Sequence, residues 1–179
     1  MSDNTKDYYS DKRRYIERVT KLIRDVFEIS IPIINMESVV EKLGGTLEKN
    51  NELLLIDAEG RLRKKDEGFI ISVNEEQSES RMNFTIAHEL GHLFLHMGYM
   101  IDEDKWNAID KQYYRKGDNE EEFEANEFAA AFLMPRTDYK DIMDRYTEGN
   151  IVSTTKIAEY FNVSVSAALN RGKWLGYLK

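Results

Sequence analysis

Apolar residues recur at helical spacing near the start of the chain. Between residues 8 and 28 they follow the pattern of one buried helix face, at Tyr15, Ile16, Val19, Leu22, Ile23, Val26 and Phe27. Pro32 ends this helix, because the residue before a proline avoids helical backbone angles. A short second helix is expected from Asn35, which can cap it, to Gly44, which suits a helix end.

The periodicity changes to that of β-strands between residues 46 and 73. Three strands are predicted, at residues 46–49, 52–57 and 69–73. A turn at residues 58–61 and a charged, exposed excursion at residues 61–67 should separate the last two. The expected sheet is small and antiparallel. It either covers the core or offers its last strand to an extended peptide, which would bind by backbone hydrogen bonds.

Two further helices carry clear apolar faces. The first runs from about residue 78 to residue 97, with leucine, phenylalanine and methionine on one stripe. The second runs from about residue 119 to residue 134, where acidic residues crowd the first turn, as the helix dipole favours. Between them, residues 98–117 lack a clear period, which is typical of a lid or a binding loop. Pro135 ends the second helix and can begin another.

Residues 154–162 and 165–175 predict a C-terminal pair of helices. Residues 151–179 hold four basic residues and one acidic residue, a net charge of +3. This segment either contacts DNA, or it caps the rest of the chain or binds a partner protein. A firm DNA binder makes about 6–10 phosphate contacts, so this small charge favours packing or protein binding over DNA binding.

Length and composition suit one main domain with a small appendage. The chain has 179 residues, and we expect a domain at residues 1–150 with the helical pair of residues 151–179 packed on it. The predicted fold class is α+β, mainly helical, with a small three-stranded antiparallel sheet. The net charge is −8, and residues 102–127 hold ten acidic residues against four basic ones. Binding of nucleic acid by the whole surface is therefore disfavoured.

Cysteine content and hydropathy together point to the cytoplasm. Cysteine is absent, which excludes a disulfide framework and any zinc site with cysteine ligands. Residues 1–11 are polar and charged and do not resemble a signal peptide. No stretch approaches the ~18 apolar residues of a membrane span. We therefore expect a cytoplasmic protein.

One pentad carries definite chemistry: His88-Glu89-x-x-His92, inside the helix expected at residues 78–97. Residues four apart lie on the same face of a helix, so both imidazoles would aim at one point, with the carboxylate of Glu89 beside it. Two neutral nitrogens and an adjacent base are what a hydrolytic zinc site needs. The alternative is a chance arrangement of packed histidines, which we disfavour because two of them flank a glutamate at this spacing.

A catalytic zinc ion usually has three protein ligands and an open position for water. His96 is the nearest candidate for the third ligand, but it lies two helical turns from His88, about 12 Å along the axis. We therefore expect His96 to neighbour the cleft or to pack. Glu122 and Glu124 are better candidates. Glu122 is preferred, because Asn126 lies four residues further on the same face and can orient a ligating histidine.

Two segments together resemble the ImmA/IrrE metallo-endopeptidase family. They are Phe84-Thr85-Ile86-Ala87-His88-Glu89-Leu90-Gly91-His92 and Glu122-x-x-Ala125-Asn126-x-Phe128-Ala129-Ala130-x-x-Leu133-Met134-Pro135. The resemblance covers about residues 70–135 and implies a zincin-like metallopeptidase core. It also implies zinc ligands at His88, His92 and Glu122 and a catalytic base at Glu89, which are the residues favoured above.

Members of that family are cytoplasmic proteins of bacteria or mobile elements that cleave helix-turn-helix repressors. By resemblance we expect a zinc-dependent endopeptidase with a separate repressor as its substrate, since the chain has no room for a fused helix-turn-helix domain before the metal motif. Two alternatives stay open: a regulatory module that does not cut, and a DNA-binding regulator acting through residues 151–179. The donor to the oxyanion also stays open among Tyr99, Tyr113, Tyr114, Tyr139 and His96.

Overall fold

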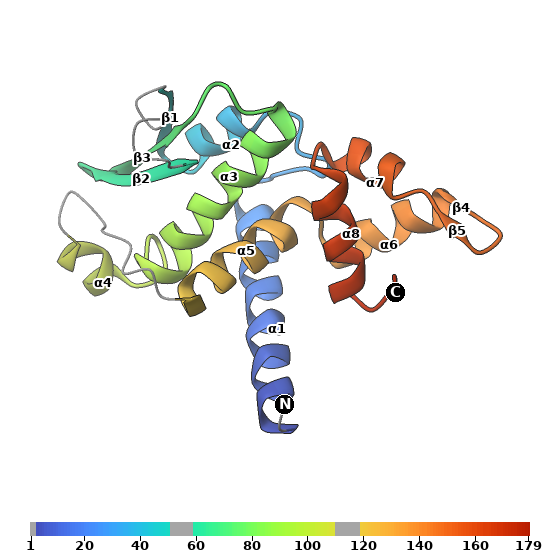
Figure 1. The fold of residues 1–179 in the computed structure, drawn as a ribbon. Helices are drawn as coiled ribbons and strands as arrows, with labels where there is room; N and C mark the ends of the chain where they lie inside the picture. The colour runs from blue at the N-terminus through green and yellow to red at the C-terminus, as the bar shows by residue number, and fades with distance from the viewer. Residues whose placement is uncertain (1–2, 51–58, 110–118) are drawn as a thin grey trace.

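The computed structural model describes residues 3–50, 59–109 and 119–179. Its helices are α1 (Asp3–Val26), α2 (Met36–Lys42), α3 (Glu79–Gly91), α4 (Glu103–Ala108), α5 (Asn119–Leu133), α6 (Arg136–Arg145), α7 (Thr154–Phe161) and α8 (Val165–Trp174). Its strands are β1 (Gly45–Lys49), β2 (Gly60–Lys65), β3 (Gly68–Val73), β4 (Thr147–Glu148) and β5 (Ile151–Val152). The α+β class predicted from the sequence is confirmed, with helices dominant (Figure 1).

The three-stranded sheet is mixed, so the prediction of a purely antiparallel sheet is wrong. The strand order is β1-β3-β2, with β1 parallel to β3 and β2 antiparallel to it. Alternation of polar and apolar residues assigns the two faces of a strand but not the direction of its neighbours, which explains the error. Two of the predicted strands correspond to β1 and β3, and the strand predicted at residues 52–57 lies outside the described residues.

Strand β2 occupies a segment that we expected to be an exposed excursion. Leu62 is 5% exposed and faces the core, whereas Arg61 on the other face is exposed. Charged side chains on an edge strand discourage pairing with another chain, and here they concealed the strand in the sequence. Because β3 has a neighbour on each side, it cannot offer its backbone to a peptide. The outer edges of this sheet, within the described residues, belong to β1 and β2.

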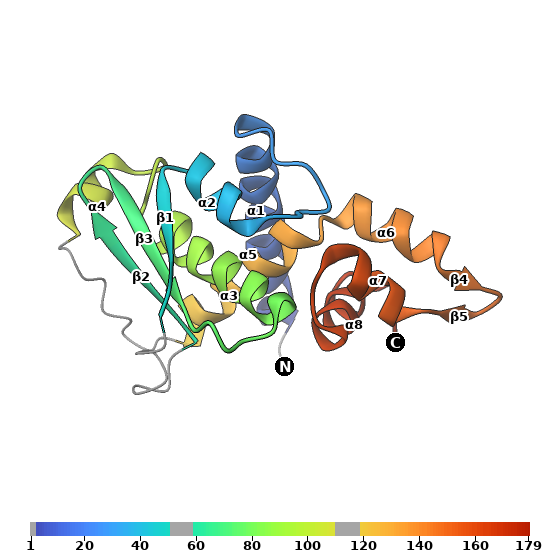
Figure 2. The same cartoon turned by 90° about the horizontal axis from the view of Figure 1, so that it is seen from above.

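Helices α3 and α5 lie side by side between the sheet and the C-terminal helices α6 to α8 (Figures 1 and 2). Gly91 permits this close contact, because a Cβ atom there would lie 2.9 Å from Ala125 Cα and 3.1 Å from Phe128 Cβ. On the other side of α3, a Cβ atom added to Gly60 of β2 would lie 2.7 Å from Thr85 Cγ2. The two glycines therefore let α3 approach both the sheet and α5.

The segment after α3 differs from the uninterrupted helix and featureless loop that we expected. Helix α3 passes into a π-helical turn, His92–His96, closed by a hydrogen bond from the Met97 N–H to the His92 carbonyl over 2.9 Å. Helix α4 follows, and its N-cap Asp102 accepts from the Lys105 N–H at 3.0 Å. A helix of 6 residues is too short to show a period in the sequence.

Buried contacts join the C-terminal helices to the rest of the molecule. Arg171 on α8 is 3% exposed, forms an ion pair with Glu17 on α1 and donates from Nε to the Met134 carbonyl at 3.0 Å. Tyr139 on α6 donates from its hydroxyl to the Ala168 carbonyl at 2.7 Å. The predicted division of the chain between residues 150 and 151 stays a prediction.

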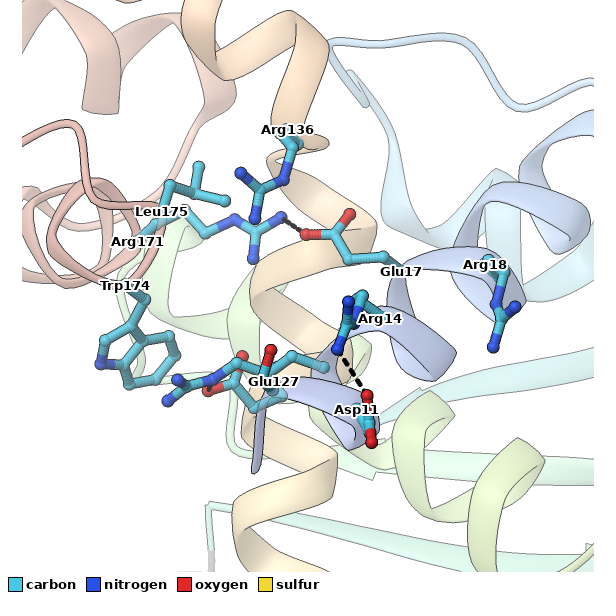
Figure 3. Close-up of a pocket in the computed structure, with 11 residues that line it drawn as sticks. Asp11, Arg14, Glu17, Arg18, Glu127, Arg136, Arg171, Trp174 and Leu175 are labelled. Atoms are coloured by element: carbon cyan, nitrogen blue, oxygen red, sulfur yellow. Dashed lines mark hydrogen bonds and ion pairs between the residues drawn. The ribbon is translucent and has the colours of Figure 1, made fainter. Parts of the chain in front are cut away.

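A cleft of about 830 Å³ lies between α1, α5 and α8 (Figure 3). We call it the arginine cleft after five of its lining residues: Arg13, Arg14, Arg18, Arg136 and Arg171. Three arginines in it pair with carboxylates, which are those of Asp11, Glu17 and Glu127. No helix of the described residues is long and apolar enough to cross a bilayer.

Candidate metal centre

Two histidines and one glutamate point their donor atoms at one another between α3 and α5. The Nε2 atoms of His88 and His92 lie 3.1 Å apart. The carboxylate of Glu122 lies 3.3 Å from His88 Nε2 through one oxygen and 3.4 Å from His92 Nε2 through the other. The structure thus brings together the three residues that the sequence suggested as metal ligands.

The spacing of these donor atoms suits a single small cation. Zinc bonds to imidazole nitrogen and carboxylate oxygen are about 2.0–2.1 Å long, and a tetrahedral set of such bonds separates neighbouring donors by about 3.3–3.4 Å. The two imidazole nitrogens lie 3.1 Å apart, and each lies 3.3–3.4 Å from its nearer Glu122 oxygen, which is close to that value. Counted as one donor atom from each residue, the three lie within 4.8 Å of one another. Two imidazoles and one carboxylate are also a known ligand set of hydrolytic zinc sites with an open fourth position. The residues therefore fit a zinc ion.

Asn126 on α5 orients His88. Its side-chain oxygen lies 3.1 Å from His88 Nδ1. Because an amide oxygen only accepts hydrogen bonds, this contact assigns the imidazole proton to Nδ1 and leaves the Nε2 lone pair directed at the cluster. Asn126 lies one helical turn after Glu122, so α5 supplies one donor atom and also the group that orients another.

His96 and Glu124 continue the polar network behind His92. The Nδ1 atoms of His92 and His96 lie 3.0 Å apart, and His96 Nε2 lies 3.0 Å from a carboxylate oxygen of Glu124. Lys12 on α1 forms an ion pair with the other oxygen of Glu124. The hydrogen bond from His96 lowers the pKa of Glu124 and Lys12 adds to this effect, although burial opposes it. Neither His96 nor Glu124 belongs to the three-donor cluster.

Glu89 lies on α3 between the two histidines in sequence and is 1% exposed. Strand β2 covers it at Gly60, where an added Cβ atom would lie 2.9 Å from Glu89 Oε1. Reasoning from the sequence missed the parts that Gly60 and Gly91 play around this site. Close contacts between distant segments leave no periodic signal, although a glycine inside a helical pattern, as at position 91, is a hint of one.

Two of the tyrosines considered as oxyanion donors are engaged elsewhere. The Tyr99 hydroxyl donates to the Leu43 carbonyl at 2.9 Å, and the Tyr139 hydroxyl donates to the Ala168 carbonyl. Burial raises the pKa of Tyr99, and it raises the pKa of Tyr139 to about 12. Tyr113 and Tyr114 lie outside the described residues, so the oxyanion donor stays open.

The amino-acid sequence matches one known protein family. A family model described as Peptidase_M78, IrrE N-terminal-like domain, matches residues 52–173. The matched segment contains the three-donor cluster and extends through α7 into α8. No curated protein matches the chain.

Proposed function

Because the chain belongs to the Peptidase_M78 family, the IrrE N-terminal-like domain, we propose that it is a zinc-dependent endopeptidase. In this proposal His88, His92 and Glu122 hold the zinc ion and Glu89 is the catalytic base. The observation that carries it is the convergence of two imidazole nitrogens and one carboxylate within 3.1 to 3.4 Å of one another. The side chain of Glu122 is 36% exposed, which leaves one side of the cluster open to solvent.

The choice of zinc rests on the chemistry of the donors. Imidazole nitrogens with one carboxylate suit zinc, whereas magnesium and calcium prefer sites built from oxygen alone. Bound in this position, zinc would act as a Lewis acid that polarises a water molecule and the scissile carbonyl. Asn126 holds His88 with its Nε2 toward the cluster, which is the orientation that a metal ligand needs.

Glu89 would move the proton. A carboxylate oxygen of Glu89 would accept a proton from the attacking water and later give it to the departing amine nitrogen. Its burial against β2 limits the orientations that the side chain can adopt. A base that is held in place loses less entropy when it reaches the reacting geometry, which favours the transition state.

We further propose that the substrate is a separate helix-turn-helix repressor in the cytoplasm, and that cutting it derepresses genes of a mobile element or a stress response. The resemblance of the two motif segments supports this choice. Within the described residues β2 is an edge strand whereas β3 is paired on both sides, so β2 rather than β3 could receive an extended peptide. The edge of β2 starts at Gly60, beside Glu89, so a peptide added there would run past the catalytic base.

DNA binding through residues 151–179 has less support. Arg171 is buried and engaged by Glu17 and the Met134 carbonyl, so its guanidinium is not available to a phosphate. Exposed lysines remain at positions 156, 173 and 179, which is too few for a firm DNA binder with its ~6–10 phosphate contacts. The other alternative is a regulatory module that binds the repressor without cutting it, and a cleavage assay distinguishes it from a peptidase.

The test is cleavage of the helix-turn-helix proteins encoded beside the gene, using purified protein supplied with zinc. The wild type should cut one of them. Glu89→Gln should bind zinc like the wild type but cut about 10²–10⁴-fold more slowly, because the proton acceptor is lost. His88→Ala should lose both zinc and cleavage. Glu41→Gln, which changes an exposed carboxylate on α2, is the matched control and should cut normally.

Two results would overturn parts of the proposal. Undiminished cleavage by Glu89→Gln would show that the base is another group. Tight binding of the repressor by the zinc-loaded wild type, with no cut product after long incubation, would instead favour the regulatory module.

A further inference from the structure

We propose that His96 and Glu124 are positioning residues that orient the imidazole of His92 for metal binding, and that Lys12 anchors this chain of contacts to α1. The inference rests on the proposed metal site and adds three residues to it. The contacts run from His92 to His96 at 3.0 Å, from His96 to Glu124 at 3.0 Å, and from Glu124 to Lys12.

The direction of each hydrogen bond follows from one constraint. His92 Nε2 faces His88 Nε2 at 3.1 Å and Glu122 at 3.4 Å, so this nitrogen must keep its lone pair to bind a metal. The proton of neutral His92 then sits on Nδ1 and is donated to His96 Nδ1. His96 in turn carries its own proton on Nε2 and donates it to the Glu124 carboxylate. Each N–H donor in the series His92, His96, Glu124 therefore meets one acceptor.

Burial makes this arrangement costly to disturb. His92 is 1% exposed and His96 is 7% exposed, so water has little access to replace a lost hydrogen bond. The Glu124 side chain is 15% exposed and is neutralised by Lys12. A carboxylate behind an imidazole raises the basicity of that imidazole and fixes the plane of its ring, which are the two properties that a metal ligand requires.

The two histidine ligands are held in different ways. His88 is oriented by the neutral amide of Asn126, while His92 is oriented through a second imidazole by a carboxylate. Helix α5 provides Glu122, Glu124 and Asn126, so one helix carries a ligand and both outer partners. Since Lys12 lies on α1, the position of the N-terminal helix is linked to the orientation of His92.

The experiment is a competition titration of zinc against a chromophoric chelator, with purified wild type and variants. His96→Leu replaces the imidazole with an apolar side chain of similar size and removes both hydrogen bonds. We expect its zinc affinity to fall about 10–100-fold. Glu124→Gln keeps an acceptor for His96 but loses the charge, so a smaller loss in the same direction is expected. Circular dichroism of the zinc-free proteins checks that each variant is folded.

A rescue variant separates positioning from simple packing. In His96→Gln, the amide oxygen can accept from His92 Nδ1 and the amide nitrogen can donate to Glu124. Its zinc affinity should therefore lie well above that of His96→Leu, whereas a packing role would favour leucine. Glu120→Gln is the matched control, because Glu120 also pairs with Lys12, at 2.7 Å, but its side chain is 46% exposed. It should bind zinc within about twofold of the wild type.

The outcomes separate this inference from the proposed function. If the wild type binds no zinc, the metal site itself fails. If the wild type binds zinc and both His96→Leu and Glu124→Gln bind it equally well, the metal site stands and the positioning role is wrong. If His96→Leu does not fold, the comparison of Glu124→Gln with Glu120→Gln decides the question, and equal affinities there would overturn the inference.

Discussion

Helix α5 contributes to two polar clusters that differ in how their groups are arranged. In the arginine cleft, opposite charges meet: Arg171 pairs with Glu17 (Figure 3). Glu127 of α5 pairs with Arg13 at 2.8 Å. In the metal cluster, lone pairs meet: two imidazole nitrogens and the carboxylate of Glu122 face one another within 3.4 Å. Opposite charges already stabilise each other, whereas converging lone pairs are stabilised by a cation. We therefore assign a structural role to the arginine cleft, whereas the proposed chemistry would take place at the metal cluster.

The largest effect on stability is expected in the arginine cleft. Arg171→Met should lower the free energy of unfolding by about 2–4 kcal/mol, because it leaves Glu17 without its buried partner and the Met134 carbonyl without its donor. Urea unfolding of the zinc-free protein measures this loss. The zinc affinity of the folded variant should be unchanged, and a clear loss of affinity would show that the two clusters are not independent.

Arg14→Ala is the control within the same cleft. Its pair with Asp11 is 2.5 Å long, but both side chains are at least 70% exposed. Solvent screens such a pair, so the free energy of unfolding should change by no more than ~0.5 kcal/mol. A loss as large as that of Arg171→Met would mean that burial is not what makes the Arg171 pair strong.

Gly91→Ala should affect both stability and the metal cluster. The added methyl group would press against Ala125 and Phe128 and push α3 away from α5. We expect a loss of about 1–3 kcal/mol in unfolding free energy, together with a large loss of zinc affinity because Glu122 moves away from the histidines. Helix propensity alone predicts the opposite sign, a gain of up to ~1 kcal/mol, so the sign of the change is decisive.

Gly172→Ala is the matched comparison for Gly91→Ala. Gly172 is also a helical glycine without room for a Cβ atom, which would lie 2.4 Å from the Tyr139 hydroxyl. It lies on α8, away from the metal cluster. This variant should therefore be destabilised while its zinc affinity stays at the wild-type value, and equal loss of zinc in both variants would contradict the specific role of Gly91.

A smaller effect than that of Arg171→Met is predicted for Tyr139, and it has a defined pH dependence. Tyr139→Phe removes the hydrogen bond to the Ala168 carbonyl and should cost about 1 kcal/mol at pH 7. Burial raises the pKa of Tyr139 from 10.0 to about 12, so the folded state keeps the phenol neutral where the unfolded chain ionises. The contribution of Tyr139 is present below pH 10 and is lost as the pH rises toward 12. Urea unfolding at pH 7 and pH 11 should show the gap between the variant and the wild type closing; a constant gap would contradict it.

The sequence predicted the parts of the site that follow from helical spacing. Residues four apart share a helix face, and this rule alone placed His88 beside His92 and Asn126 beside Glu122. The same reasoning rejected His96 as a ligand, and the structure places it against Glu124 instead. The contact of His96 with Glu124 joins two helical segments, and the ion pair with Lys12 joins a third. Spacing along one helix carries no information on such contacts.

The three-stranded sheet was harder to predict from the sequence than the metal cluster, because strand pairing depends on contacts between distant segments. The strong β-propensity of residues 69–73 located β3, but nothing in the pattern revealed that β1 runs parallel to it. The charged residues of β2 concealed an edge strand, because the features that keep an edge from aggregating also make it look like a loop. For β2 the deciding contacts are tertiary, because Leu62 is buried in the core and Gly60 lies against Thr85 and Glu89 of α3.

X-ray absorption at the zinc edge, on protein loaded with one equivalent of zinc, identifies the atoms that bind the metal. We expect the atoms bound to zinc to be nitrogen and oxygen alone, at about 2.0–2.1 Å, with more distant scattering from two imidazole rings. In His88→Ala the signal of two imidazoles should be lost. A wild-type spectrum that shows no imidazole, or a protein that retains no zinc after one equivalent is added, would contradict the assignment of His88, His92 and Glu122 as the metal site.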